Sequence, residues 1–212
     1  MGSVENFVTS GKKCIGIASN YYSFLKAINK TKSDVPGIFL KPTSSYITEG
    51  QKIVIPKGFT TVNEEIELGV IIGKKCKNVS EQEAMDYVGG YCAALDMTAA
   101  CQMKPQGSWT LAKAFDTACP VSRFIPKEKI PDPHNVNLWL KVNGEEWQNE
   151  NTSDLVFKVP YLISYLSKYF TLEPGDLIVT GSPAGVRAVK KGDIIEAGLQ
   201  GIVSVKFEVD EE

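Results

Sequence analysis

Apolar and β-branched residues fall in short segments along most of the chain, and turn-forming residues separate these segments. Segments of this length and composition are typical of β-strands. Between two of them, Asn143 and Gly144 predict a type I′ hairpin turn, because both residues tolerate a positive φ. The predicted strands cover residues 51–56, 64–73, 89–98, 136–147, 176–181, 192–199 and 202–209.

Helical patterns are fewer than strand patterns. Residues 80–88 begin with Ser80 and Glu83 at the spacing of a capping box, and residues 159–170 place Pro160 in the first turn of an apolar stripe. The strands follow one another without regular alternation with helices, which argues against a Rossmann sheet. The pattern predicts a mainly β fold with peripheral helices (α+β), built as a mixed, mostly antiparallel sandwich or roll.

Residues 18–30, "ASNYYSFLKAINK", form a third helical segment. Ser19 and Asn20 are candidate helix caps, and the spacing of Tyr22, Leu25 and Ile28 predicts that these three side chains point inward. The segment contains no residue of an obviously catalytic type.

Length and composition are those of an ordinary globular protein, with 212 residues, 43% of them hydrophobic and 23% charged. The sequence shows no internal repeat, low-complexity tract or linker, so we interpret residues 1–212 as a single domain. The formal net charge is −2 and the basic residues are scattered, which gives no footprint for nucleic acid or an anionic membrane. A small-molecule partner is the better expectation.

Cysteine usage and the apolar runs bear on the compartment. The five cysteines are far apart and lack C-x-x-C spacing, so we expect mostly buried thiols in a reducing compartment. Apolar runs such as residues 68–72 are too short to cross a bilayer, and the chain does not start with a signal peptide's apolar segment or an Arg-rich presequence. Neither secretion nor a membrane location is expected.

Three carboxylates are candidate metal ligands. Glu65 and Glu67 lie two residues apart on a predicted strand, so both side chains point to the same face. Asp96 ends an otherwise apolar strand, where a carboxylate needs a cation or hydrogen bonds. Oxygen ligands of this kind suit Mg²⁺ or Mn²⁺. The alternative is the solvated polar face of a sheet, which by itself explains alternating glutamates well.

Two further features could hold an anionic substrate. Lys113 lies in the apolar segment "WTLAKAFDTACP", where it is either a snorkelling surface lysine or a cation beside the metal. Residues 180–186, "TGSPAGV", form a Gly-rich turn whose backbone N–H groups and Ser182 hydroxyl could bind an anion. Turns of this composition are also common as purely structural features.

Ordered blocks over nearly the whole chain resemble the fumarylacetoacetate hydrolase family, most closely its small single-domain branch of acylpyruvases and oxaloacetate decarboxylases or tautomerases. The blocks are "FLKPTSSY", "EIELGVIIG", "AMDYVGGYCAALDMTA", "WTLAKAFDTACPVS", "LWLKVNGE", "VPYLISYLSKYFTLEPGDLIVTGSPAGV" and "GDIIEAGL". The resemblance implies the mixed β-sandwich or β-roll of the family's C-terminal domain, a homodimer, and one Mg²⁺, with Mn²⁺ as a possible substitute. It assigns the metal to Glu65, Glu67 and Asp96.

The same resemblance implies the substrate and its contacts. Lys113 is expected beside the cation as the catalytic residue, and the expected substrate-binding residues are Gly181, Ser182, Pro183 and Lys41. The substrate is a 2-oxo or dicarboxylic acid whose enolate the metal stabilises. One such site can serve hydrolysis of an acylpyruvate, decarboxylation of oxaloacetate, or its keto–enol exchange, which are hydrolase, lyase and isomerase reactions.

The chain departs from the family pattern in two places. Relatives carry a His and, three residues on, a Glu as the general base on a lid helix, whereas the aligned positions in the lid-like segment, within residues 1–35, are Phe24 and Ala27. Relatives also continue Thr-Ala-Arg-Asp-x-Gln after the aspartate, whereas this chain has Ala100 at the Arg position and a shorter loop. Loss of a general base commonly costs about 10²–10⁴-fold in rate, so we expect weakened hydrolysis and retained enolate chemistry.

Some alternatives stay open at this point. A catalytically degenerate paralogue that binds a metal or a metabolite is the main alternative, and Tyr21, Tyr22 or Glu49 could replace the missing base. The only histidine, His134, lies in a surface segment of the family and is not expected to be catalytic. The resemblance favours the mitochondrial matrix, with the cytoplasm as the other location.

Overall fold

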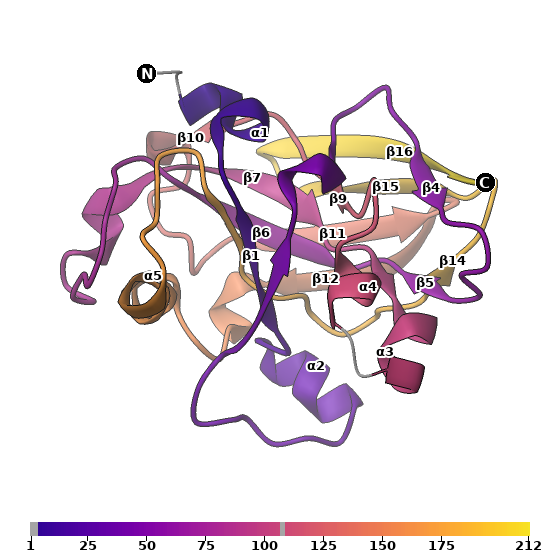
Figure 1. Cartoon of the computed structure of the whole chain (residues 1–212), viewed down its shortest axis with the longest axis horizontal. Helices are drawn as coiled ribbons and strands as arrows, with labels where there is room; N and C mark the ends of the chain where they lie inside the picture. The colour runs from indigo at the N-terminus through magenta and orange to yellow at the C-terminus, as the bar shows by residue number, and fades with distance from the viewer. Residues whose placement is uncertain (1–3, 107–108) are drawn as a thin grey trace.

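The computed structural model describes residues 4–106 and 109–212, and β-strands form the centre of the molecule (Figure 1). The larger sheet has six strands in the order β10-β7-β6-β13-β1-β2, and the second has five in the order β12-β11-β15-β16-β4. Among the described neighbours in these two sheets, only β1 with β13 and β16 with β4 run parallel. The strands are β1 (Cys14–Ala18), β2 (Gly37–Lys41), β4 (Ile53–Ile55), β6 (Ile66–Ile72), β7 (Val88–Leu95), β10 (Ile125–Pro126), β11 (Asn137–Val142), β12 (Glu145–Asn151), β13 (Leu177–Val179), β15 (Ile194–Leu199) and β16 (Val203–Glu211).

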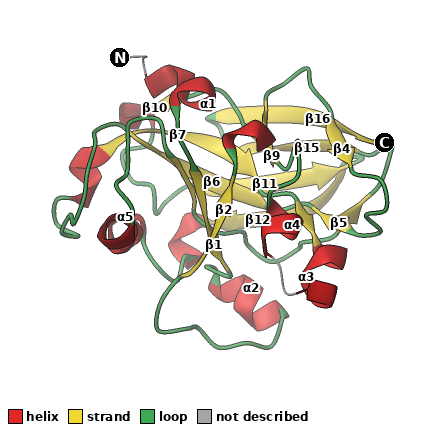
Figure 2. Cartoon of the chain, in the orientation of Figure 1, coloured by secondary structure: helices red, strands yellow, loops and turns green. Residues whose placement is uncertain are grey.

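Short strands and helices surround these sheets (Figure 2). One small sheet has the order β14-β5-β8, and another pairs β3 with β9. The short strands are β3 (Tyr46–Ile47), β5 (Val62–Asn63), β8 (Thr98–Ala99), β9 (Cys119–Pro120) and β14 (Ala188–Val189). The α-helices are α1 (Phe7–Ser10), α2 (Tyr22–Ala27), α3 (Ala100–Gln106), α4 (Trp109–Lys113) and α5 (Val159–Tyr169), and short 3₁₀ turns cover Val4–Asn6, Thr43–Ser45, Ala84–Tyr87, Lys127–Lys129 and Thr152–Asp154.

The core lies between the two large sheets. Side chains of β6 in one sheet and of β11 and β15 in the other belong to one continuous apolar cluster. Every residue of β6 is buried, which explains why this strand has an apolar run instead of the alternation of a half-exposed strand. The predicted mainly β fold with peripheral helices is confirmed, and each predicted strand segment contains a strand of the structure.

The predicted hairpin and the second predicted helix are also confirmed. Asn143 has φ 52° and Gly144 φ 83°, and they connect β11 to β12. The Asn143 side chain additionally donates to Asp193 Oδ1 at 2.9 Å, which anchors the turn to the neighbouring strand connection. Helix α5 starts with Val159 and Pro160 and buries its apolar stripe against the core.

The predicted helix over residues 80–88 is wrong. The Ser80 hydroxyl donates to Glu83 Oε2 at 2.6 Å, so the expected side-chain contact forms. This contact supports only a turn followed by a short 3₁₀ segment, because the backbone at the end of the segment is hydrogen-bonded to the chain that follows β6. The Tyr87 carbonyl accepts from Gly73 N–H at 2.7 Å, and β7 begins at Val88.

The segment over residues 18–30 forms the short helix α2, and its inward face differs from the prediction. Leu25 is buried as expected, but Tyr22 and Ile28 are 49% and 38% exposed, so the prediction is wrong for these two residues. The chain turns at Ser19, which has φ 53°, and Tyr21 stays extended and fully buried. The helix therefore starts later than the pattern suggested, and a different face turns inward.

The predicted caps of α2 are used in another way. The Asn20 side chain donates to Thr180 O at 2.8 Å and to Phe157 O at 3.0 Å, so it connects this segment to two distant loops. The first-turn N–H of Ser23 is instead satisfied by Asp154 Oδ2 at 2.8 Å. In the described part of the chain, no helix has the length and apolarity needed to span a membrane.

Candidate active site

The three candidate carboxylates converge on one point. Glu65 lies just before β6, Glu67 lies within it, and Asp96 follows β7, the antiparallel neighbour of β6. Asp96 N–H donates to Glu65 O at 2.8 Å, which sets the register at the strand ends. One carboxylate oxygen from each residue lies within 4.8 Å of the other two. The same-face spacing on β6 and the pairing with β7 together produce this cluster.

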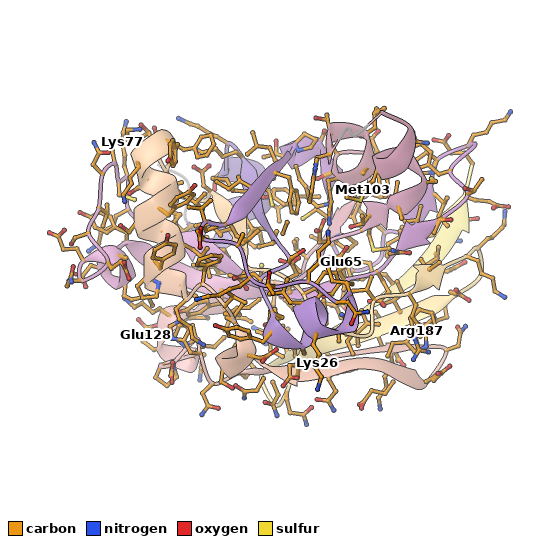
Figure 3. All side chains as sticks on the ribbon, turned by 90° about the horizontal axis from the view of Figure 1, so that it is seen from below. Lys26, Glu65, Lys77, Met103, Glu128 and Arg187 are labelled. Atoms are coloured by element: carbon orange, nitrogen blue, oxygen red, sulfur yellow. The ribbon has the colours of Figure 1, made fainter. Side chains whose placement is uncertain are left out.

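The cluster lies under helices at one end of the larger sheet. Figure 3, which looks up from below, shows Glu65 between the labelled Lys26 of α2 and Met103 of α3. Glu67 and Asp96 are 1% exposed, and the Glu65 side chain is 16% exposed. Glu67 Oε2 accepts from the N–H of Gly181 at 2.6 Å, so the Gly-rich turn directly supports a carboxylate of the cluster.

Lys113 is buried beside the carboxylates, so the snorkelling interpretation is wrong. Its ammonium forms an ion pair with Asp96 Oδ2, lies 3.3 Å from Glu65 Oε1 and donates to Thr98 Oγ1 at 2.5 Å. The Phe39 ring lies 4.6 Å from the same nitrogen and packs against Trp109, one turn before Lys113 on α4. The aromatic pair and the carboxylates together hold the ammonium in one position.

Lys41 does not line the cavity at the cluster, contrary to the expected substrate contact. Its ammonium is buried, lies 2.7 Å from Asp96 Oδ1, and donates to the carbonyls of Lys113 at 2.7 Å and Ala118 at 2.8 Å and of Met97 at 3.2 Å. These acceptors occupy the N–H groups of the Lys41 ammonium. The geometry supports a role in holding Asp96 and the end of α4.

The charges of the cluster favour a cation. Burial raises the pKa of Glu65, and burial together with the charge of Asp96 raises the pKa of Glu67 well above its usual range. Burial alone would lower the pKa of Lys113, but Asp96 and then Glu65 outweigh it and raise that pKa, so the lysine stays protonated. The ammonium groups of Lys41 and Lys113 pair with Asp96 and Glu65, so a bound cation would be what favours the ionised form of Glu67. An all-oxygen donor set of this kind fits a hard divalent cation.

A cavity of about 170 Å³ opens onto the cluster, and its lining combines polar and apolar side chains. The polar ones supply carboxylate, ammonium and hydroxyl groups, and the apolar ones are aromatic and aliphatic. Phe24 and Ala100, the two departures from the family pattern, both line the cavity, whereas Ala27 is exposed at the surface. The polar lining residues include Glu65, Asp96, Thr98, Lys113 and Ser182, and the apolar ones include Phe24, Phe39, Met103 and Trp109.

None of the suggested replacement bases lines this cavity in the described part of the chain. Tyr21 is buried outside it, Tyr22 is half exposed, and Glu49 accepts from the backbone of Lys206 at 3.2 Å on the surface. Of the described acidic residues, only Glu65 and Asp96 face the cavity. A larger groove of about 1070 Å³ runs along the outside of β2, but its described lining contains no carboxylate.

Of the three residues of the Gly-rich turn that were expected to bind substrate, only Ser182 is among the described residues that line the cavity. Ser182 lines the cavity, but the Gly181 N–H is bonded to Glu67 and is therefore not available to an anion. The Pro183 carbonyl accepts from Gln148 Nε2 at 2.8 Å. No sequence motif marks Gln148, Thr98 or Phe39 as residues of the site, and their contacts are made between distant segments.

Gly185 explains why this turn needs glycine. It has φ +107°, and a Cβ atom there would lie 1.9 Å from the Trp147 carbonyl oxygen. Gly192 is a matched control, since it has φ +87° with open space around it. We expect Gly185→Ala to lower the free energy of unfolding by about 1–3 kcal/mol more than Gly192→Ala, and to displace Ser182. Urea denaturation of both variants measures the difference, and equal losses would contradict the expected crowding.

His134 is a structural residue at the start of α5, far along the chain from the cluster. Its Nε2 accepts from Val159 N–H at 3.1 Å, and therefore satisfies one of the free N–H groups of the first helical turn. Burial, together with the nearby Lys158, lowers the pKa of His134, although Asp132 acts in the opposite direction. The folded protein thus holds a neutral imidazole, consistent with the expectation of a non-catalytic histidine.

Acid should therefore weaken the protein at this position. Because the folded pKa is below the unfolded one, the contribution of His134 is complete above the unfolded value near pH 6.5 and disappears as the pH falls through the folded pKa. We expect a loss of about 1 kcal/mol, or about 2–4 °C in Tm, relative to His134→Gln, which keeps an acceptor without titrating. Thermal unfolding of both proteins from pH 7.5 to 5 tests this, and parallel curves would refute it.

Comparison with known proteins agrees with this geometry. The chain is 49% identical over 211 residues to the mitochondrial oxaloacetate tautomerase FAHD1 of Homo sapiens, covering 98% of this chain and 96% of the relative. It is 42% identical over 212 residues to the mitochondrial oxaloacetate decarboxylase of Dictyostelium discoideum, covering 97% of each. The crystal structure of fumarylpyruvate hydrolase from Pseudomonas aeruginosa, in complex with Mn²⁺ and pyruvate, matches with a TM-score of 0.86 and 29% identity, over 94% of this chain and 90% of that one. The sequence profile described as "Fumarylacetoacetate (FAA) hydrolase C-terminal" matches residues 13–210, and the chain therefore belongs to the fumarylacetoacetate hydrolase family.

Proposed function

We propose that this protein is a Mg²⁺-dependent enzyme of 2-oxo acids that catalyses tautomerisation or decarboxylation of oxaloacetate. The observation that carries the proposal is the convergence of Glu65, Glu67 and Asp96 within 4.8 Å of one another, beside a protonated Lys113. The relatives named oxaloacetate tautomerase and oxaloacetate decarboxylase support the substrate. Mn²⁺ in the related fumarylpyruvate hydrolase supports a divalent cation, with Mg²⁺ as our specific choice.

The proposed roles follow from the position of each side chain. Glu65, Glu67 and Asp96 would hold the cation, which when bound polarises the keto group of a 2-oxo acid. The positive charge of Lys113 would attract the anionic substrate and hold Asp96 and Glu65 in place, while Lys41 holds Asp96 from the buried side. Phe24, Phe39 and Trp109 would exclude water from the apolar part of the cavity lining.

The cavity lining favours tautomerisation over hydrolysis. Keto–enol exchange of oxaloacetate moves one proton between C3 and the C2 oxygen and needs no water, whereas cleavage of an acylpyruvate consumes an activated water molecule. Among the described residues, the wall at Phe24 offers no group that could accept a proton from water. We therefore propose weak acylpyruvate hydrolysis beside the main activity. The catalytically degenerate alternative is not favoured, because the buried carboxylates and Lys113 remain assembled at considerable electrostatic cost.

We further propose a mitochondrial location and a homodimer. The location rests on the mitochondrial relatives. For the dimer, the support is the apolar surface beside β2, an edge strand of the larger sheet, where Leu40 and Tyr169 are 48% and 62% exposed. Sedimentation equilibrium of the purified protein tests the dimer, and a monomer at micromolar concentration would refute it.

Assays of the purified protein with oxaloacetate and with acetylpyruvate test the proposed activity. Each substrate is measured with Mg²⁺ and after removal of metal by a chelator. We expect Mg²⁺-dependent tautomerisation or decarboxylation of oxaloacetate and slow cleavage of acetylpyruvate. Binding of Mg²⁺ without turnover of either substrate would support the catalytically degenerate alternative instead.

A further inference from the structure

Gln148 is a buried residue of β12, in the five-stranded sheet, that contacts the cavity turn on the other side of the core. It is 1% exposed. Its Nε2 donates to Ser182 Oγ and to Pro183 O, both at 2.8 Å, and its Oε1 accepts from Ile66 N–H at 2.9 Å. Ile66 lies between the two glutamates of the carboxylate cluster. One side chain thus connects the metal-binding strand with the turn that lines the cavity.

The donor and the acceptor in each of these hydrogen bonds can be assigned. The Pro183 carbonyl can only accept a hydrogen bond, and the Ile66 N–H can only donate one. These two partners define which end of the Gln148 side chain is nitrogen and which is oxygen. Ser182 Oγ must therefore accept the remaining N–H of Gln148.

This constraint determines the direction of the Ser182 hydroxyl proton. Ser182 Oγ accepts the hydrogen bond from Gln148, so the hydroxyl proton of Ser182 stays available to be donated to another group. No side chain or backbone group in the described part of the chain accepts that proton, and Ser182 lines the cavity. The hydroxyl can therefore donate to an oxygen of a ligand held at the carboxylate cluster.

Local backbone geometry places Gln148 at this point. The ladder between β11 and β12 shifts register so that Leu140 pairs with Gln148 but Lys141 pairs with Glu146. Such an irregularity changes the direction of side chains near it. On the opposite side, Gly185 lets the cavity turn pack so closely that a Cβ atom would lie 3.1 Å from Gln148 Cγ.

We propose that Gln148 is a positioning residue that makes Ser182 a hydrogen-bond donor to the carboxylate or keto oxygen of a 2-oxo acid. The inference rests on the proposed function, since it concerns the substrate of the same site. Gln148 would act through Ser182 and would not touch the substrate. Loss of this orientation should weaken ligand binding and raise KM, with little change in kcat, because the hydroxyl contacts the substrate before and during reaction.

Gln148→Glu tests the inference, because it keeps the size of the side chain and reverses one hydrogen bond. An ionised carboxylate cannot donate to Ser182, so the hydroxyl proton would turn from the cavity toward residue 148. The probe is pyruvate, titrated calorimetrically into the Mn²⁺-loaded protein. We expect Gln148→Glu and Ser182→Ala each to raise the Kd of pyruvate about tenfold to a hundredfold, the range for a hydrogen bond to a charged group.

The double variant separates orientation from general damage. If Gln148 acts only through Ser182, adding Gln148→Glu to Ser182→Ala should change the Kd by no more than about twofold. Asn149→Asp adds the same charge to the next residue of β12, whose side chain is exposed, and should leave the Kd within about twofold of the unmodified protein. Should Gln148→Glu fail to fold, Gln148→Met enters the same cycle.

Two kinds of result would overturn the inference. One is additive losses in the double variant or unchanged pyruvate binding in Gln148→Glu. The other is a loss of Mn²⁺ affinity or of kcat at unchanged KM, which would indicate a structural role at Ile66. If the unmodified protein does not bind pyruvate in the presence of Mn²⁺, the proposed function itself fails and the inference fails with it.

Discussion

Glu67→Gln is expected to abolish Mg²⁺ binding and to lower the rate of oxaloacetate conversion by at least about 10³-fold, since a metal polarising a keto group supplies several kcal/mol. The metal-free variant should nevertheless be as stable as the unmodified protein, or more stable. Burial, and after it the charges of Asp96 and Glu65, disfavour the ionised form of Glu67 and raise its pKa; a neutral glutamine avoids both effects while keeping an oxygen for the Gly181 N–H. This outcome would mean that the proposed metal site lowers the stability of the metal-free protein.

Thermal unfolding with and without Mg²⁺ measures both effects. At a Mg²⁺ concentration about 100 times Kd, the unmodified protein should gain about 2.7 kcal/mol, or about 5–10 °C in Tm. Glu67→Gln should gain nothing. Glu64→Gln is the matched control, because Glu64 is equally buried but accepts from Arg187 N–H outside the cluster. A Mg²⁺-dependent increase in Tm that persists in Glu67→Gln would exclude Glu67 as a ligand.

Installing a general base on α2 should selectively raise acylpyruvate hydrolysis. Phe24→His combined with Ala27→Glu places an imidazole on the cavity wall and a carboxylate three residues later, at an exposed position within reach of that imidazole. A general base contributes about 10²–10⁴-fold, so we expect acetylpyruvate cleavage to rise by at least about 10²-fold while oxaloacetate tautomerisation changes little. Metal-assisted enolisation does not require this base, whereas activation of water does.

The matched control places the same residue types on the solvent face of the same helix. Tyr22 and Lys26 are both exposed, so Tyr22→His with Lys26→Glu alters the charge of α2 without reaching the cavity. Initial rates on both substrates, measured at saturating Mg²⁺, compare the two double variants. Rapid acetylpyruvate hydrolysis by the unmodified protein would contradict the prediction, because it would require a base that the described cavity lining does not contain.

The sequence pattern alone was sufficient to predict the features that depend on local geometry. The two-residue spacing of Glu65 and Glu67 dictates a common face on any strand. Asn143-Gly144 adopts positive φ at both residues in the expected hairpin. Pro160 and the apolar stripe behind it form α5 as predicted. In each case, the interactions that decide the structure lie within a few residues of one another.

Predictions from the local sequence were wrong where groups from distant segments hydrogen-bond in the same region. Ser80 and Glu83 make their side-chain contact, yet the sheet takes up the backbone at Tyr87 and no α-helix forms. Within residues 18–30 the helix starts later than the pattern predicts, because Asn20 hydrogen-bonds to Thr180 and Phe157 and keeps the chain extended. Tertiary hydrogen bonds outweigh propensities worth less than about 1 kcal/mol per residue.

The sequence by itself determined which residue types are available at the site: three carboxylates on two strands, a lysine in an apolar segment, a Gly-rich turn and an aromatic Phe24. Only the tertiary structure decided how they are used. It directed Lys41 to Asp96 instead of the cavity, committed the Gly181 N–H to Glu67, and brought Gln148 of the second sheet to Ser182. The physical reason is that a buried polar group must find a partner within hydrogen-bonding distance, and that partner is selected by packing in space, whatever its separation along the chain.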